Sequence, residues 1–254
     1  MGLLPNSKIM EPIFIRLIFN TLSIIFLTAL PFLILYKWKT AKLIDRKIQT
    51  GIQTESQIKR EILNGISTLA IFSLVGTIMY YLITKNIVRL ETGFSISIIF
   101  QVLILLFFHD LYFYFIHRMM HTKYLFHKIH FVHHQSVSPT PFTSFSFHPY
   151  EAVLEILIFP ILFLSYDWNM FAVILFGILS RMLNITGHLG FDFFPKNQAE
   201  NKILKYLNTT IYHDLHHQKN SYNFGLYFNW WDRIFKTKDG KYEEYFAERK
   251  AKLE

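Results

Sequence analysis

Cysteine is absent from this sequence of 254 residues. Its absence excludes a disulfide framework, a cysteine-ligated zinc site and thiolate chemistry. Charged residues are also scarce, because they make up 17% of the chain against about 25% of a typical soluble domain. Together with a mean hydropathy of +0.25, this scarcity favours a membrane protein over one or two soluble domains.

Acidic residues are the rarer charged class, since 18 Asp and Glu face 26 Lys and Arg and leave a net charge of +8. Nucleic-acid binding is one reason for such an excess. In a chain with 52% hydrophobic residues, basic loops that orient membrane helices are the better explanation. Aromatic residues, at 18%, are typical of membrane-span packing and interfacial belts, so we expect no nucleic acid partner.

Three uncharged stretches are long enough to cross a bilayer as helices, which takes about 20 residues. They are Leu17–Tyr36 with 20 residues, Ile62–Thr84 with 23 and Thr92–His109 with 18. The apolar pattern of the third continues through Asp110 to Ile116. We therefore expect three membrane spans in the first half of the chain.

A shorter apolar pair follows, Ile156–Tyr166 and Trp168–Ser180, with 11 and 13 uncharged residues. Neither is long enough to predict a span by itself. Together they predict a helical hairpin with its tip near Asp167, which crosses the bilayer fully or re-enters it partway. The predicted fold class is an all-α, polytopic membrane protein with about three spans plus this hairpin and a histidine-rich cap.

Basic residues are concentrated in the first loop. Residues 37–61 hold seven Lys and Arg against three acids, whereas the next loop holds only Lys85 and Arg89. The positive-inside rule places the first loop in the cytoplasm and the N-terminus outside. Three crossings and a hairpin then put residues 117–150 and 188–254 together on the cytoplasmic face.

Nine of the twelve histidines follow a pattern typical of metal ligands. Eight lie in three boxes, and His188 stands alone; the boxes are His117-x3-His121, His130-x2-His133-His134 and His213-x2-His216-His217. Spacings of three and four bring imidazoles to one side of a helix, where they can converge on one ion. One such pair is also common in an ordinary interface, but three boxes on one predicted membrane face favour a metal site. Nine ligands are too many for one tetrahedral ion, and two metals with four or five ligands each fit better.

The ligands alone leave the metal open, because imidazole binds zinc, iron, copper and nickel. Zinc has no redox chemistry, and a zinc hydrolase would need fewer ligands. Two iron ions could activate O₂, and the adjacent apolar spans indicate a lipid substrate, so the combination suggests oxidation of a C–H bond. A transition-metal transporter is the alternative. It would need polar ligands within several spans, and only His109 and Asp110 lie within a clear one.

Further motifs surround the boxes. They are Asp110-x3-Tyr114-x2-His117-Arg118, Ser138-Pro-Thr-Pro-Phe142, His148-Pro-Tyr-Glu151, Asn184-x3-His188-x-Gly190, Asn223-Phe-Gly225 and Trp231-Asp232-Arg-Ile-Phe-Lys-Thr237. With the boxes, they resemble the fatty acid hydroxylase/sterol desaturase superfamily over about Gln101 to Thr237. The resemblance implies an integral-membrane, O₂-dependent di-iron oxidoreductase that acts on a fatty acyl, sterol or related lipid. We expect hydroxylation, with desaturation, or oxidation of a carotenoid or sterol, as the alternative.

The resemblance also implies nine metal ligands: His117, His121, His130, His133, His134, His188, His213, His216 and His217. One position departs from the pattern, because fatty acid 2-hydroxylases of this family have a histidine where this chain has Asn184. Asn184 could coordinate through its carbonyl or a bridging water, or support a ligand from outside the metal shell. Asp110 is expected to support a ligand in the same way, since carboxylates often orient ligating imidazoles and it shares a helix stripe with His117.

Other candidates for that supporting role are the carboxylates Glu151, Glu155, Asp214 and Asp232. Three histidines remain outside the boxes. We expect His109 to pack within its span or support a ligand, His127 to lie on the surface, and His148 to orient the loop or a ligand.

Electrons are expected from a separate donor, such as a ferredoxin or cytochrome b5, because the chain lacks the His-Pro-Gly-Gly heme motif of a fused cytochrome b5 domain. The basic residues 37–60 could dock an acidic donor, although contact with the membrane surface is the stronger expectation. The chain thus divides into N-terminal transmembrane helices with a basic loop (1–100), a fatty acid hydroxylase-like catalytic domain (101–237) and a charged C-terminal tail (238–254).

Overall fold

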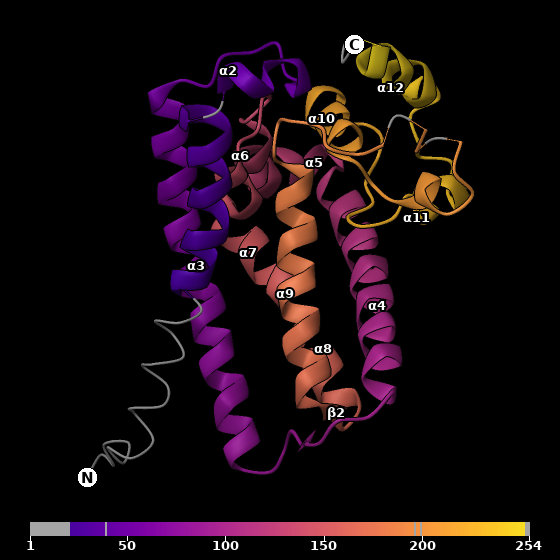
Figure 1. The fold of residues 1–254 in the computed structure, drawn as a ribbon. Coiled ribbons are helices and arrows are strands. Elements are labelled where there is room, and N and C mark those ends of the chain that lie inside the picture. The colour runs from indigo at the N-terminus through magenta and orange to yellow at the C-terminus, as the bar shows by residue number, and fades with distance from the viewer. Residues whose placement is uncertain (1–20, 39, 196, 199, 252–254) are drawn as a thin grey trace.

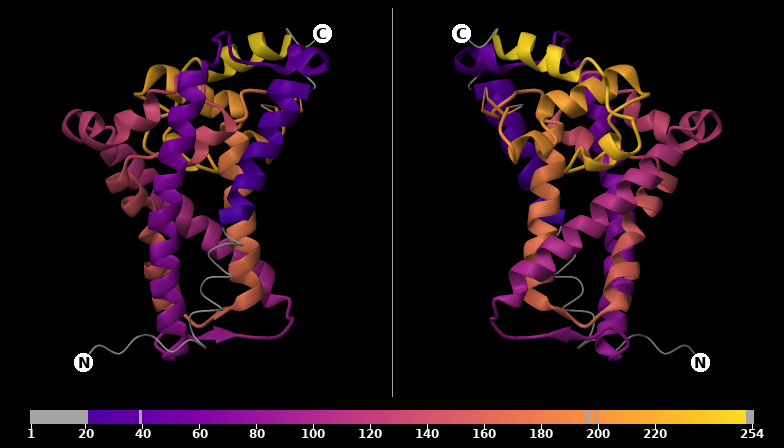
Figure 2. Two further views of the ribbon diagram at one scale, coloured as in Figure 1. Left: turned by 90° about the vertical axis from the view of Figure 1, so that its left-hand side faces the viewer. Right: turned by 90° about the vertical axis from the view of Figure 1, so that its right-hand side faces the viewer.

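A computed structural model describes residues 21–38, 40–195, 197–198 and 200–251. Long helices stand side by side, and most of the short helices gather at one end of them (Figure 1). We call this end, with α2, α5, α6 and α10–α12, the cap end, and the opposite end the far end. The two side views in Figure 2 show that the cap covers only one end of the bundle.

Four helices are long and apolar enough to cross a membrane. They are residues Thr21–Trp38, which end in the π-helical η1 (Leu33–Trp38), α3 (Glu55–Thr84), α4 (Ser97–Met120) and α9 (Met170–Gly187). The predicted three spans are therefore confirmed where the structure describes them, and α9 adds a fourth; residues 17–20 of the first predicted span lie outside the described residues. Helix α3 is longer than its uncharged run because it begins in the polar first loop, where the Thr54 hydroxyl accepts a hydrogen bond from Gln57 N–H at 3.2 Å.

The predicted hairpin has a broken first arm and a continuous second arm. Helices α7 (Pro149–Ile156) and α8 (Ile158–Ser165) form the first arm, and α9 forms the second. Between them, β2 (Trp168–Asn169) pairs in parallel with β1 (Leu90–Glu91), which lies in the connection from α3 to α4. Because that connection is at the far end, the hairpin extends over the full length of the bundle and does not turn back partway.

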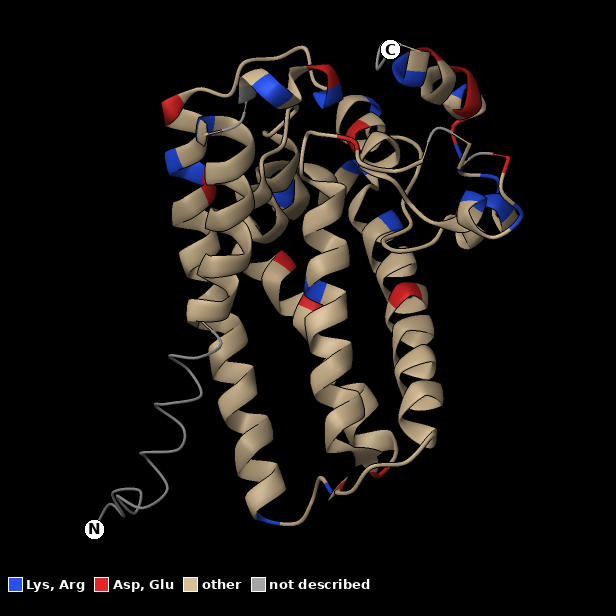
Figure 3. Cartoon of the chain, in the orientation of Figure 1, with Lys and Arg blue, Asp and Glu red and all other residues tan. Residues whose placement is uncertain are grey.

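The cap consists mainly of short helices. They are α2 (Thr40–Leu43), η2 (Ile44–Arg46), α5 (Lys123–Leu125), η3 (Phe126–His130), α6 (Phe131–His134), η4 (Pro141–Phe145), η5 (Leu204–Tyr206), α10 (Thr210–Lys219), α11 (Trp230–Ile234) and α12 (Tyr242–Ala251). Figure 3 shows that most charged residues lie in this cap and few lie along the middle of the long helices. This distribution is expected of helices that pass through hydrocarbon.

Two buried acids fasten the C-terminal segment to the bundle. The Asp110 carboxylate on α4 accepts hydrogen bonds from Tyr227 N–H at 2.7 Å and from the Trp231 indole at 2.9 Å. The Asp232 carboxylate accepts from Phe224 N–H and Gly225 N–H, as well as from two side-chain hydroxyls. Residues 224–232 are thereby held against α4.

Residues 238–254, predicted as a charged tail, contain the packed helix α12. Phe246 and Tyr242 of α12 are buried in an apolar cluster with Leu215 of α10 and Ile48 of the first loop. The Lys250 ammonium forms a buried ion pair with Asp192. Helix α12 therefore holds α10 from outside, and α10 carries one of the histidine boxes.

Candidate metal centre

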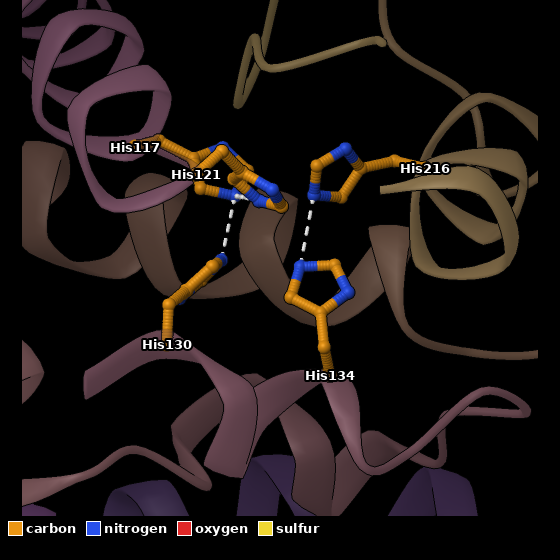
Figure 4. Close-up of side chains that lie close together, drawn as sticks. All are labelled: His117, His121, His130, His134 and His216. Atoms are coloured by element: carbon orange, nitrogen blue, oxygen red, sulfur yellow. Dashed lines mark hydrogen bonds between the residues drawn. The ribbon is translucent and has the colours of Figure 1, made fainter. Parts of the chain in front are cut away.

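All eight box histidines and His188 gather at the cap end in two groups. The first group is His117, His121, His130, His134 and His216, and the second is His133, His188, His213 and His217. Within each group, one nitrogen of every imidazole lies within 4.8 Å of the corresponding nitrogen of every other. Figure 4 shows the first group, in which imidazoles from α4, η3, α6 and α10 point toward one another.

The two longer boxes each contribute to both groups. His130 and His134 join the first group, while His133 between them joins the second. The box on α10 is reversed, because His213 and His217 join the second group and His216 the first. Helical residues four apart share a face, whereas adjacent residues point about 100° apart. The H-x-x-H-H spacing thus lets one short helix supply ligand atoms to two neighbouring sites.

The site is almost fully enclosed. Eight of the nine histidines are buried, and His121 is half-buried. Burial lowers the pKa of His188 to about 4, and it lowers the pKa of His133 and of His216 well below the ordinary value. Neighbouring imidazoles lower the pKa of His133 and of His216 further, because one charged ring would repel the others. The rings are therefore neutral, which is the form that binds metals.

Backbone carbonyls orient three of the rings. The Nδ1–H group of His117 donates to Phe224 C=O at 2.8 Å, and that of His216 donates to Tyr222 C=O at 2.6 Å. In the second group, Nδ1–H of His188 donates to Asn184 C=O at 2.9 Å. Since a carbonyl can only accept, Nδ1 carries the proton in each ring and Nε2 is free as an acceptor.

These free nitrogens face other nitrogens at short distances. In the first group, Nε2 of His117 is 3.1 Å from Nε2 of His130. In the second, Nε2 of His188 is 2.9 Å from Nε2 of His213 and 3.4 Å from that of His133. Buried nitrogens that converge in this way can bind a shared positive ion. An all-nitrogen donor set of this kind fits transition-metal ions, including iron.

Glu151 supports the first group from α7. Its Oε1 lies 2.7 Å from Nδ1 of His130, and both side chains are fully buried. Glu151 is one of several carboxylates predicted to support a ligating imidazole, and it is the one that contacts a ring of the first group. Among the described residues, Glu155, one turn further along α7, forms no hydrogen bond or ion pair with a histidine of either group.

The side chains of Asp110 and Asn184, which were predicted to support ligands, both bind groups other than an imidazole. Asp110 makes no hydrogen bond to an imidazole among the described residues, because Tyr227 N–H and the Trp231 indole occupy its two oxygens. The Asn184 side chain donates to Ser144 C=O at 2.9 Å. Asn184 instead supports His188 through its backbone carbonyl, as described above.

The three other histidines lie outside both groups. His109 is buried within α4, and its Nδ1 is 2.7 Å from the Tyr227 hydroxyl. His127 is exposed on η3. His148 caps α7, where Nδ1 accepts a hydrogen bond from Tyr150 N–H at 3.3 Å.

The first loop also reaches the second group, a contact that no local sequence pattern indicates. Gln49 donates to Pro139 C=O at 2.8 Å and to the Asp214 carboxylate at 3.0 Å, beside His213. Gly190 lies next to this contact with φ of +71°, and a side chain there would overlap the Tyr36 hydroxyl. That overlap explains the glycine two residues after His188.

The buried carboxylate of Glu61 links α3 to the segment after the second histidine box. By sequence, Glu61 counts only as one of the acids of the first loop. Its carboxylate accepts hydrogen bonds from the hydroxyls of Ser136 at 2.7 Å and Thr140 at 2.5 Å. These residues lie two and six positions after His134, so α3 holds the segment that follows the second box. An acid immediately before the 23-residue uncharged run of α3 was the available signal for this role.

The chain is similar in sequence to a known protein family and to several known proteins. Residues 102–237 match the family model described as fatty acid hydroxylase. The chain is 31% identical over 191 residues to lathosterol oxidase of Rattus norvegicus, which covers 71% of this chain and 60% of the relative. It is 29% identical over 160 residues to a C-4 methylsterol oxidase of Schizosaccharomyces pombe, covering 61% and 52%. It is also 33% identical over 130 residues to a Delta(7)-sterol 5(6)-desaturase of Leptosphaeria maculans, covering 50% and 33%.

The matched segment contains every histidine of both groups. The chain spans about 60% of the length of the lathosterol oxidases that it matches. No solved structure gives a significant match.

Proposed function

Because this chain belongs to the fatty acid hydroxylase family, we propose that it oxidises a C–H bond of a membrane lipid with O₂ at a di-iron site. The observation that carries the proposal is the division of nine imidazoles into groups of five and four, with free nitrogens converging in each. Two iron ions would supply the activation of O₂ when bound. The protein supplies neutral nitrogen ligands, their orientation and an enclosed site.

Each group would hold one iron ion. The first would use His117, His121, His130, His134 and His216, and the second His133, His188, His213 and His217. Carbonyl oxygens of Phe224, Tyr222 and Asn184 fix three rings, and Glu151 fixes a fourth. Because their rotation is restricted before the metal arrives, the site is preorganised.

A lipid substrate is supported by the position of the site. The chain is an integral membrane protein, with four apolar helices leading to the end at which both groups lie. The relatives named above are oxidases and a desaturase of sterols. We propose a fatty acyl, sterol or related lipid, whose apolar part lies among the long helices and whose reacting carbon reaches the cap end.

Hydroxylation is the reaction that we propose, and desaturation is the second candidate. The similarity to a protein named as a desaturase favours the second. Both reactions need the same metal site and the same removal of a hydrogen atom from an unactivated carbon. They differ in whether oxygen is then added or a second hydrogen is lost.

The cytoplasmic orientation of the site is also a proposal. It is supported by the concentration of Lys and Arg in residues 37–61, and by the position of that loop against the second group through Gln49. In this orientation, a soluble electron carrier of the ferredoxin or cytochrome b5 type has access to the cap end.

The test compares lipids extracted from cells that express the chain, cells that express a His133→Ala variant, and cells without the gene. The variant is a matched control because it keeps the membrane helices and removes one proposed ligand. Mass spectrometry should find a lipid that has gained one oxygen atom only with the unaltered chain. Loss of two hydrogens instead would assign desaturation, and identical lipid profiles in all three would contradict an oxidase function.

A further inference from the structure

The first group of histidines reaches the protein surface at one position. His121 is half-buried, whereas the other eight are buried. Phe126 lies against it with ring centroids 5.3 Å apart, and the next segment of chain, α5 and η3, projects sideways from the bundle near the cap end (Figure 2). His121 is therefore the ring of the first group that is most accessible to solvent.

The surface around His121 is basic. From residue 111 to residue 150 the sequence contains no Asp or Glu, but it contains Arg118, Lys123 and Lys128. All three basic residues are exposed. Large aromatic side chains are exposed beside them, since Tyr124 is 67% exposed and Phe131 is 43% exposed. We call Arg118, Lys123, Tyr124, Lys128 and Phe131 the His121 face.

Oxidation of a lipid by O₂ needs electrons from outside the chain. Hydroxylation consumes one O₂, two protons and two electrons for each C–H bond converted to C–OH, and releases one water. Desaturation consumes the same two electrons and two protons and releases two waters. The chain has no cysteine to hold an iron–sulfur cluster of its own, and the proposed source of both electrons is a separate one-electron carrier.

We propose that the His121 face is the docking surface for an acidic one-electron carrier protein. This inference rests on the proposed function and adds the location at which its electrons enter. Exposed positive charge on a segment of chain without acids attracts an acidic partner and accelerates its encounter. The exposed aromatic side chains provide apolar contact area once the partner has docked. Docking here brings the carrier next to a ring of the first group.

The other basic surface is less suited to electron delivery. The basic first loop contacts the second group through Gln49 and Asp214, but every histidine of that group is buried. A carrier docked there would be separated from the second group by the loop itself. Lys42 and Lys59 of this basic region are exposed and provide a control with the same change of charge.

The experiment uses the full iron-loaded chain in nanodiscs of uncharged phosphatidylcholine. A Lys123→Glu, Lys128→Glu double variant is compared with the unaltered chain and with a Lys42→Glu, Lys59→Glu double variant. Rapid mixing with a reduced acidic ferredoxin, without O₂, measures the second-order rate of ferredoxin oxidation. Ferredoxin binding to the metal-free chain is measured separately, and iron content and reduction by dithionite report on the intact site.

We expect the His121-face variant to oxidise ferredoxin about tenfold more slowly and to bind it more weakly at low salt. Both differences should disappear at high salt, because ions screen exposed charges. Dithionite reduction and iron content should be unchanged, and the Lys42, Lys59 variant should behave like the unaltered chain.

Three results would overturn the proposal. Equal rates for both variants would remove the distinction between the two surfaces, and slowing only in the Lys42, Lys59 variant would move the docking site to the first loop. A defect that arises only in nanodiscs with anionic lipid would assign Lys123 and Lys128 to the membrane surface. If dithionite reduces no iron in the unaltered chain, the proposed di-iron function fails, which is a different outcome from loss of the docking site.

Discussion

The carboxylate of Glu151 lies 2.7 Å from Nδ1 of His130, and both groups are fully buried. The contact joins α7 of the hairpin to the segment that carries the second histidine box. It also leaves Nε2 of His130 directed at the first group. A residue outside the proposed metal shell therefore orients a ring that we propose as a ligand.

Replacement of Glu151 should weaken the first iron site. Glu151→Ala removes the acceptor, and we expect iron affinity to fall by about 10- to 100-fold, as is usual for the loss of such a support. Competition with a chelator measures the affinity. Glu155→Ala is the control, since it changes the same helix one turn away; an equal loss there would show that helix α7, and not the contact with His130, is responsible.

Single ligand substitutions should separate the two groups. His216→Ala removes a first-group ligand and His133→Ala removes a second-group ligand, so each variant should retain about one iron ion where the unaltered chain retains two. His148→Ala, outside both groups, should retain both ions. Metal analysis together with membrane insertion of each variant gives the answer, and loss of both ions from either variant would show that the groups do not load independently.

Helix α12 should stabilise the box on α10. Phe246 is 2% exposed within the cluster that α12 forms with α10, and Phe246→Ala should cost about 3–5 kcal/mol of unfolding free energy. Thermal unfolding in detergent measures the effect. Glu244→Ala on the exposed side of the same helix should leave the stability unchanged; a similar loss from both would mean that the helix is merely sensitive to any substitution.

The orientation of the cap can be measured because the chain has no cysteine of its own. Single cysteines at Lys42, Tyr124 and Ser221 should react with an impermeant reagent from the cytoplasmic side. A cysteine at Asn86, in the connection at the far end, should react only from the opposite side. Labelling of Tyr124→Cys and Asn86→Cys from the same side would contradict a bundle that crosses the membrane.

Local sequence patterns predicted much of the site, because ligand spacing is a local property. The i and i+4 spacing of His117 and His121 follows from the geometry of one helix. The sharing of each longer box between two groups depends on how α6 and α10 pack against each other, and spacing does not contain that information. The orienting carbonyls of Phe224 and Tyr222 are equally invisible, since every residue has a carbonyl.

Contacts between residues far apart in the sequence were also not predictable from local patterns. Asp110 shares a helix stripe with His117, yet its carboxylate binds Tyr227 and Trp231 from more than 100 positions later in the chain. Arg181 ended the uncharged run that suggested a short hairpin arm, but α9 continues past it to Gly187. One charge interrupts a hydropathy pattern without interrupting a helix, because the backbone hydrogen bonds of the helix do not depend on it.

The most direct test of the account is the iron content of the purified full chain in nanodiscs. Iron added anaerobically, followed by removal of unbound metal, should leave two ions per chain. The His216→Ala, His133→Ala double variant should retain none while still inserting into the membrane. One ion per unaltered chain, or two ions in that double variant, would contradict the assignment of the nine histidines to a di-iron site.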